Sequence, residues 1–154
     1  MRKEPALPAT LASGVVAGLA GTFVMTAFQK FVEMPLTGRA DSFAPAGFAE
    51  KVLPIRPTSG AGRKRLNLAT HFALGAMWGA AFGLAGHAGL HGQRAVTAVF
   101  AVVYTGDVAL NSALGLYQPS TWTARDWIID VVDKLVQAEA TGLAFDRLLG
   151  RGVC

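Results

Sequence analysis

Residues 66–90 read LNLATHFALGAMWGAAFGLAGHAGL and contain no Asp, Glu, Lys or Arg. The uncharged run continues to Gln93, so 28 residues separate Arg65 from Arg94. A second run, of 25 residues, lies between Glu4 and Lys30. About 20 apolar residues are enough to cross the hydrocarbon core of a bilayer. Only 16% of the chain is charged, against about 25% in a typical soluble domain, so the sequence predicts an integral membrane protein.

We expect one all-α membrane domain over residues 1–154, built as a four-helix transmembrane bundle. The predicted spans are approximately residues 9–32, 66–90, 94–117 and 124–149. Pro8 suits the entrance of the first span and Pro35 its exit. Residues 96–104 are rich in β-branched and aromatic residues and taken alone could form a strand, but the length of the apolar segment favours a helix.

A loop rich in proline and glycine joins the first two spans. Inside it, Asp41 and Ser42 can cap a short helix over residues 43–53. This segment has apolar and charged residues side by side, so we expect it to lie at the membrane interface between the first and second spans.

The fourth predicted span has a heavy load of charged residues. They are Asp126, Asp130, Asp133, Lys134, Glu139, Asp146 and Arg147. A central charge opposes insertion of an isolated helix by a few kcal/mol. Its apolar residues leave Asp126, Asp130, Asp133 and Gln137 on a common stripe, so either neighbouring helices shelter the stripe or the helix lies along the interface.

Small residues recur at every fourth position on the first two spans. The stripes comprise Gly14 and Gly18 on the first span, and Gly75, Gly79 and Gly83 on the second. Small residues at this spacing allow helix backbones to approach closely in membranes. We expect the stripes to serve helix packing, either within the chain or in a homo-oligomer or complex with another membrane protein.

Polar residues of three different spans fall at a similar depth. If the spans alternate in direction, His71, Asn111 and Asp130 lie about 8–9 Å below the surface on the side of the first loop. Asp107, Asp133 and Lys134 continue the polar region toward the midplane, with Lys134 as the expected counter-charge for Asp107 or Asp130. We predict a polar pocket open to that side, which serves either as structural glue or as a proton or ion path.

Several functions are disfavoured by the sequence. It carries no nucleophile elbow, phosphate-binding loop or zinc-protease motif, so we expect no catalytic residues, no metal site and no cofactor. His87 and His91 have a spacing that could hold metal but fall at a turn without a carboxylate or thiol nearby. Cys154 is the single cysteine, which excludes an intramolecular disulfide.

The basic residues favour one orientation in the membrane. Eight flank the spans on the side of the first loop, namely Lys30, Arg39, Lys51, Arg56, Arg63, Lys64, Arg65 and Arg125. Five lie on the other side: Arg2, Lys3, Arg94, Arg147 and Arg151. The positive-inside rule therefore predicts a cytoplasmic first loop, and we attribute the net charge of +4 to orientation and not to nucleic-acid binding.

The segments 18–22 (GLAGT), Met25–Thr26 and 43–53, with His71 followed by Gly75, Gly79 and Gly83, resemble the YagU-like small inner-membrane proteins of bacteria. That family has no assigned biochemical activity. The resemblance implies a multi-pass protein of the bacterial inner membrane and, through the protein that names the family, a connection with acid tolerance.

These observations lead to three functional hypotheses. The first is an inner-membrane protein whose one-sided polar pocket has a structural or interaction role in envelope or acid-stress homeostasis. The alternative is a small proton- or ion-conducting transporter that uses the same residues. The third, a haem or redox subunit, has least support because only His71 lies well inside a span.

Overall fold

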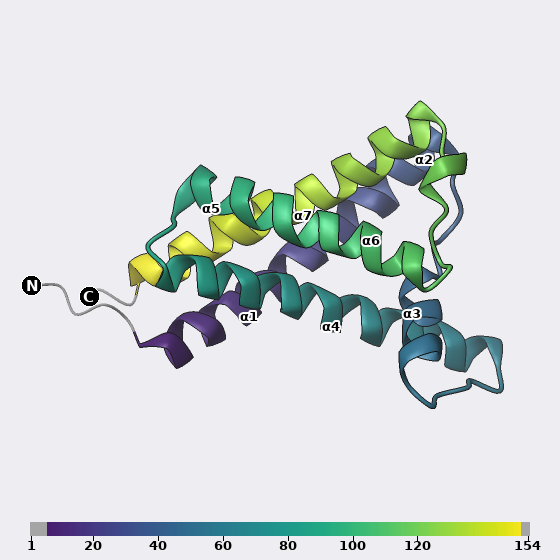
Figure 1. Cartoon of the computed structure of the whole chain (residues 1–154), viewed down its shortest axis with the longest axis horizontal. Helices are drawn as coiled ribbons and strands as arrows, with labels where there is room; N and C mark the ends of the chain where they lie inside the picture. The colour runs from purple at the N-terminus through teal and green to yellow at the C-terminus, as the bar shows by residue number, and fades with distance from the viewer. Residues whose placement is uncertain (1–5, 152–154) are drawn as a thin grey trace, which may run out of the picture.

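The computed structural model describes residues 6–151, and every regular element in this range is helical (Figure 1). Helix α1 (Leu7–Phe28) continues through a π-helical turn (Gln29–Glu33) into α2 (Met34–Thr37), and the short helix α3 (Ala44–Val52) follows. Helix α4 (Gly60–His87) precedes a third long segment, formed by α5 (Gly92–Val99), a π-helical turn (Phe100–Tyr104) and α6 (Thr105–Ala113). A short 3-10 turn (Pro119–Thr121) leads into α7 (Ala124–Arg151).

Three of the long helical segments have the length and composition of membrane spans: Leu7–Thr37, Gly60–His87 and Gly92–Ala113. Helix α7 matches α4 in length at 28 residues, but its charged residues keep it out of this group. The prediction of an all-helical chain with long apolar helices is therefore confirmed. Arg2, Lys3 and Cys154 lie outside the described residues.

Pro35 does not end the first helix, contrary to our prediction. The N–H of Met34 donates to the carbonyl oxygen of Gln29 in the π-helical turn, so Pro35 enters the first turn of α2. A proline in a first turn needs no N–H partner, and the helix can continue. It ends at Gly38, whose φ of 72° requires a residue that tolerates the left-handed region.

Two other boundaries also differ from the prediction. Helix α4 begins at Gly60, six residues before the predicted start, because the Ser59 hydroxyl caps it by accepting a hydrogen bond of 3.0 Å from the Gly62 N–H. The third segment ends at Ala113 and not at Tyr117, since the N–H groups of Leu116 and Tyr117 fold back onto the Asn111 carbonyl. The predicted helix 43–53 is present as α3.

The long segments alternate in direction and pack side by side (Figure 1). Helix α1 makes the most extensive contacts, with α4 and with α7. At one end lie α2, α3 and the connection to α7, which we call the α3 end. At the opposite end lie the start of α1, the end of α7 and the α4–α5 connection.

Glycines bring the backbones of α1 and α4 into direct contact. A Cβ added to Gly79 would lie 2.8 Å from the Cα of Gly18, and one added to Gly83 would lie 2.8 Å from the Thr10 carbonyl oxygen. Gly14 and Gly75 approach the opposite helix equally closely, and all these glycines are buried. The two stripes thus face each other within the chain.

Several polar side chains are buried in the structure, and many large apolar side chains are exposed. Besides Phe82 and Phe145, the largest fully buried side chains are three threonines, Thr10, Thr22 and Thr141. Large apolar side chains instead cover the outside, among them Phe23 at 67% exposed and Val102 at 73%. Exposed apolar side chains on long helices, with polar groups sheltered between the helices, are expected where lipid surrounds the helices.

Candidate functional site

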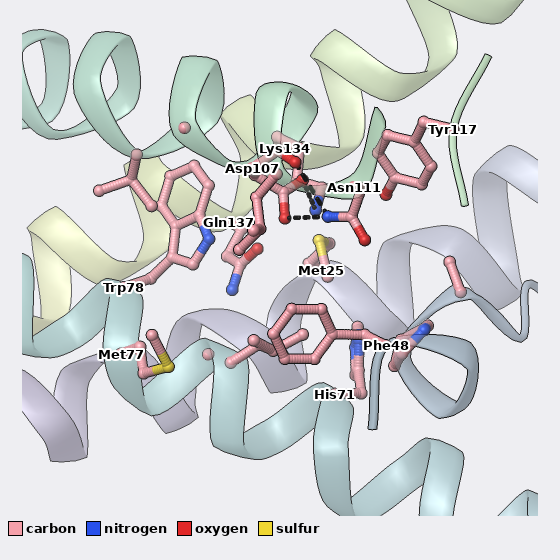
Figure 2. A pocket seen from close by; sticks show the side chains of 17 residues that line it. Met25, Phe48, His71, Met77, Trp78, Asp107, Asn111, Tyr117, Lys134 and Gln137 are labelled. Carbon is pink, nitrogen blue, oxygen red and sulfur yellow. Dashed lines mark hydrogen bonds and ion pairs between the residues drawn. The ribbon is translucent and has the colours of Figure 1, made fainter. Parts of the chain in front are cut away.

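A cavity of about 390 Å³ lies between α4 and α6, backed by α1 and α7 (Figure 2). We call it the α4–α6 cavity. The size lies within the range of small-molecule sites. Its polar lining consists of His71, Asp107, Asn111, Tyr117, Lys134 and Gln137, and its remaining lining consists of Met25, Ala44, Pro45, Phe48, Leu74, Gly75, Met77, Trp78, Val103, Gly106 and Leu110.

Backbone geometry explains why a cavity forms here. Helix α5 packs against both α4 and α7, whereas the backbone of α6 makes few contacts with either helix. The backbone of the third segment is therefore closer to α4 and α7 along α5 than along α6. Side chains of modest size, including Gly106 and Leu110, do not fill the space that results.

An ion pair lies on the wall of the cavity formed by α6 and α7. The Lys134 Nζ is 3.1 Å from Oδ2 of Asp107, and the two side chains are 19% and 16% exposed. Asn111 lies one turn after Asp107 and donates from Nδ2 to Oδ1 of the same carboxylate at 3.0 Å. Both carboxylate oxygens are therefore engaged, which offsets part of the desolvation cost of a sheltered pair.

Hydroxyl and amide groups complete the polar wall. The Gln137 Nε2 donates to the Thr22 hydroxyl at 3.0 Å, and this hydroxyl donates to the Gly18 carbonyl. The His71 Nε2 lies 3.0 Å from the Thr26 hydroxyl, across the α1–α4 contact. Burial raises the pKa of the Tyr117 phenol, in the connection after α6, so this hydroxyl remains a protonated donor.

Four of the six predicted pocket residues line the cavity, namely His71, Asp107, Asn111 and Lys134. Asp130 and Asp133 do not. Asp130 lies one helical turn closer to the α3 end than Lys134 does, and it accepts a hydrogen bond of 2.9 Å from Tyr104. Asp133 precedes Lys134 by about 100° around the helix and turns toward α1, where Gln29 donates to its Oδ2 at 2.8 Å.

The remaining oxygen of Asp133 is notable. Its Oδ1 is buried and has no hydrogen-bond partner among residues 6–151, and the residue as a whole is only 5% exposed. A buried carboxylate oxygen without a partner loses its hydration without compensation. This position therefore costs stability.

The cavity opens sideways and not toward the α3 end, contrary to the predicted opening. Its exposed lining residues are Met77 on α4, with 66% exposed, and Gly106 and Leu110 on α6. At the α3 end, Pro45 and Phe48 of α3 line the cavity and cover it. The rim therefore lies on the apolar outer surface between the two helices.

Helix α3 is fastened to the beginning of α4. The Asn67 Oδ1 accepts from the Ala46 N–H at 3.0 Å, and its Nδ2 donates to the Ser42 carbonyl at 3.0 Å. Arg63 donates to Glu50 at 2.9 Å and lies over the Phe43 ring. Sequence patterns indicated an interfacial helix here but did not indicate that it covers a cavity.

Apolar side chains close the cavity toward the opposite end. Beyond Trp78, the buried core consists of Ala17, Phe82, Ala95, Val96, Val99, Ala138 and Phe145. The rings of Phe82 and Phe145 are 6.4 Å apart at its centre. The polar groups that line the cavity thus belong to the half of the molecule near the α3 end.

Trp78, Phe48 and Tyr117 were absent from the predicted site. Aromatic residues in an apolar segment are ordinarily assigned to the core, so the sequence carried no signal that they border a cavity. Within residues 6–151, His, Cys, Asp and Glu side chains form no group of three that could hold a metal ion. His87 and His91 lie at the α4–α5 connection, remote from the cavity.

Comparison with known proteins yields no match: no family model, no curated protein and no solved structure is similar to this chain. The resemblance to the YagU-like family therefore stays a prediction.

Proposed function

We propose that this chain is a multi-pass membrane protein that spans the bilayer four times and binds a small amphipathic molecule, taken from the lipid, in the α4–α6 cavity. The observation that carries the proposal is the position of the rim. Met77 and Leu110 belong at once to the cavity lining and to the exposed apolar surface. A molecule dissolved in the hydrocarbon region could enter between α4 and α6 without crossing water.

The proposed fourth span is α7. Its apolar residues Ile128, Val132 and Leu143 are exposed, while Asp133 and Gln137 are buried. In water this arrangement would place both kinds of side chain unfavourably, whereas in lipid it shelters the charges among neighbouring helices. It favours spanning over lying along the interface.

We further propose the bacterial inner membrane as the location, with the α3 end in the cytoplasm. The basic residues around α3 and the start of α4, among them Arg56, Arg63 and Lys64, support this orientation. The biological role would be an interaction or homeostatic one in the envelope, exerted through the bound molecule.

Binding explains the cavity better than conduction does. A proton or ion path must continue across the membrane, but the apolar core around Phe82 and Phe145 follows the cavity directly. The rim on the lipid-facing surface also has no use in a channel. The geometry therefore favours a ligand site over the transporter hypothesis.

Quenching of a single tryptophan tests the proposal. Replacing Trp122 and Trp127 by phenylalanine leaves Trp78, which lines the cavity at 4% exposed, as the single tryptophan. Titration of the purified protein in detergent micelles with 1-bromodecane should quench its fluorescence in a saturable manner, because heavy-atom quenching requires contact.

Gly106→Phe in the same background should abolish this quenching. Outside its own part of the helix, no atom lies within 4 Å of a Cβ added at Gly106, so this position has space for a larger side chain at the rim, where it would obstruct entry. Ala109→Phe is the matched control, since Ala109 is exposed on the same helix but does not line the cavity. Equal quenching in both variants, or none in the parent, contradicts the proposed entry route.

A further inference from the structure

The charges inside the cavity constrain what it can bind. Within the described part of the chain, the charged side chains that line it are Asp107 and Lys134, and they neutralise each other at 3.1 Å. An anionic group that approached Lys134 would lie close to the Asp107 carboxylate, and a cationic group near Asp107 would meet the Lys134 ammonium. Neither ionic class gains a net attraction.

The carboxylate is also saturated with donors. Its two oxygens accept from Asn111 and from Lys134, so little capacity remains for a ligand ammonium group. An anionic ligand could compete for Lys134 only by disrupting the pair with Asp107. Breaking a sheltered pair leaves one charge uncompensated, which is strongly unfavourable.

Two neutral donors, in contrast, are aimed into the cavity and unused. Figure 2 shows the indole nitrogen of Trp78 and the hydroxyl of Tyr117 turned toward its centre. Trp78 is only 4% exposed, and no side-chain hydrogen bond within residues 6–151 involves either group. Both atoms are accessible from the cavity, so a donor without a partner on this largely apolar wall marks a place for an acceptor.

The rest of the lining suits an apolar tail. Leu74, Met77, Val103 and Leu110 extend from the interior to the rim. A molecule with its head at Trp78 and Tyr117 could therefore leave its hydrocarbon part against these residues or in the lipid outside. This division matches the usual composition of small-molecule sites, in which a few polar groups fix orientation in an apolar pocket.

We infer that the ligand of the α4–α6 cavity is an uncharged amphiphile whose head accepts hydrogen bonds through a carbonyl oxygen, as in a long-chain ketone, an ester or a quinone. This inference rests on the proposed function and adds the class of ligand. The ion pair acts as the selectivity element, because it makes the site polar without giving it a net charge.

Three probes with the same chain length test the inference: dodecan-2-one, dodecanoate and dodecylamine, at about pH 8.5, where the acid and the amine are ionised. Each is added to the Trp78-only protein already quenched by 1-bromodecane, and recovery of fluorescence measures displacement. We expect the ketone to displace the quencher at a concentration at least roughly tenfold lower than either ion, a ratio equivalent to about 1.4 kcal/mol.

Two variants test which residues give the cavity its selectivity for an uncharged head group. Tyr117→Phe should weaken displacement by the ketone roughly three- to tenfold, as expected for one hydrogen bond, and leave displacement by dodecane unchanged. Asp107→Asn frees Lys134 from its counter-charge and should improve displacement by dodecanoate at least roughly tenfold, with a smaller change for the ketone.

The outcomes separate the inference from the proposal beneath it. If dodecanoate or dodecylamine displaces the quencher as well as the ketone does, the site selects only a tail, and the inference is overturned while ligand binding stands. If 1-bromodecane never quenches Trp78, the proposed function itself fails. Selective displacement by the ketone that Tyr117→Phe weakens supports both.

Discussion

Substituting Gly79 by alanine should weaken the contact between α1 and α4. The added Cβ would lie 2.8 Å from the carbonyl carbon of Gly14 and 2.8 Å from the Cα of Gly18, and closer still to the Gly14 oxygen. Carbon atoms in contact are normally about 3.5–4.0 Å apart. Because these neighbours are all backbone atoms, no side chain can rotate to make room, and the helices must separate by about 1 Å.

The expected loss follows from two opposing effects. Overpacking that displaces backbone costs about 3 kcal/mol, the upper part of the usual range. Replacing glycine by alanine within a helix recovers about 1 kcal/mol. The net loss of unfolding free energy for Gly79→Ala should therefore be about 2 kcal/mol.

Gly106→Ala supplies the control, because nothing lies within 4 Å of its added Cβ. This variant should keep the helical gain of about 1 kcal/mol without any clash, so the two variants should differ by about 3 kcal/mol. Equilibrium unfolding in mixed micelles, followed by circular dichroism, measures both. A Gly79→Ala protein as stable as the parent, or a difference below about 1 kcal/mol between the variants, would refute the close backbone contact.

Three further predictions concern polar contacts. Asp107→Leu alone should lower the unfolding free energy by about 3 kcal/mol because it leaves Lys134 without its counter-charge. Adding Lys134→Met should restore most of the loss, and a double-mutant cycle of unfolding free energies in micelles measures the coupling. Asp133→Asn should raise the unfolding free energy by about 1 kcal/mol, because it removes the charge from a carboxylate that has a buried oxygen without a partner. An unfolding free energy below that of the parent protein would mean that Oδ1 has a hydrogen-bond partner. Asn67→Ala removes both hydrogen bonds to the α3 segment and should make Trp78 more accessible to acrylamide in the Trp78-only protein. Stopped-flow or steady-state quenching would detect the increase, and unchanged quenching would mean that other contacts hold α3 in place.

The positions of the long helices could be predicted from the sequence because uncharged runs of this length have few alternatives. The run of residues 5–29 contains all of α1, and the run of residues 66–93 contains most of α4, which is displaced toward the N-terminus by six residues. Helix ends were harder, since they depend on single hydrogen bonds. The Ser59 cap and the π-helical turn before Pro35 carry no periodic signal, and both shifted a boundary.

The candidate site was predicted only in part, and α7 shows why. Asp130 and Asp133 belong to one polar stripe and Lys134 directly follows Asp133, so the sequence suggested a single pocket. Three different neighbours meet these residues, however: Tyr104 contacts Asp130, Gln29 contacts Asp133 and Asp107 contacts Lys134. Which neighbour each residue meets depends on the rotation of α7 against the other helices, which no pattern within α7 itself can determine.

The π-helical turn at residues 100–104 has a consequence for the third segment as a whole. A π turn accommodates one additional residue, which rotates everything after it by about 100° relative to a regular α-helix. In a regular helix Asp107 would share a face with Val96, eleven positions earlier, and Val96 lies in the apolar core. The wide turn lets the first half of the segment present valines to the core and the second half present Asp107 and Asn111 to the cavity. If this turn were tightened to a regular α-helix with no residue removed, the ion-pairing carboxylate would point in the same direction as the core valine, so the division of this helix between packing and binding rests on a single wide turn.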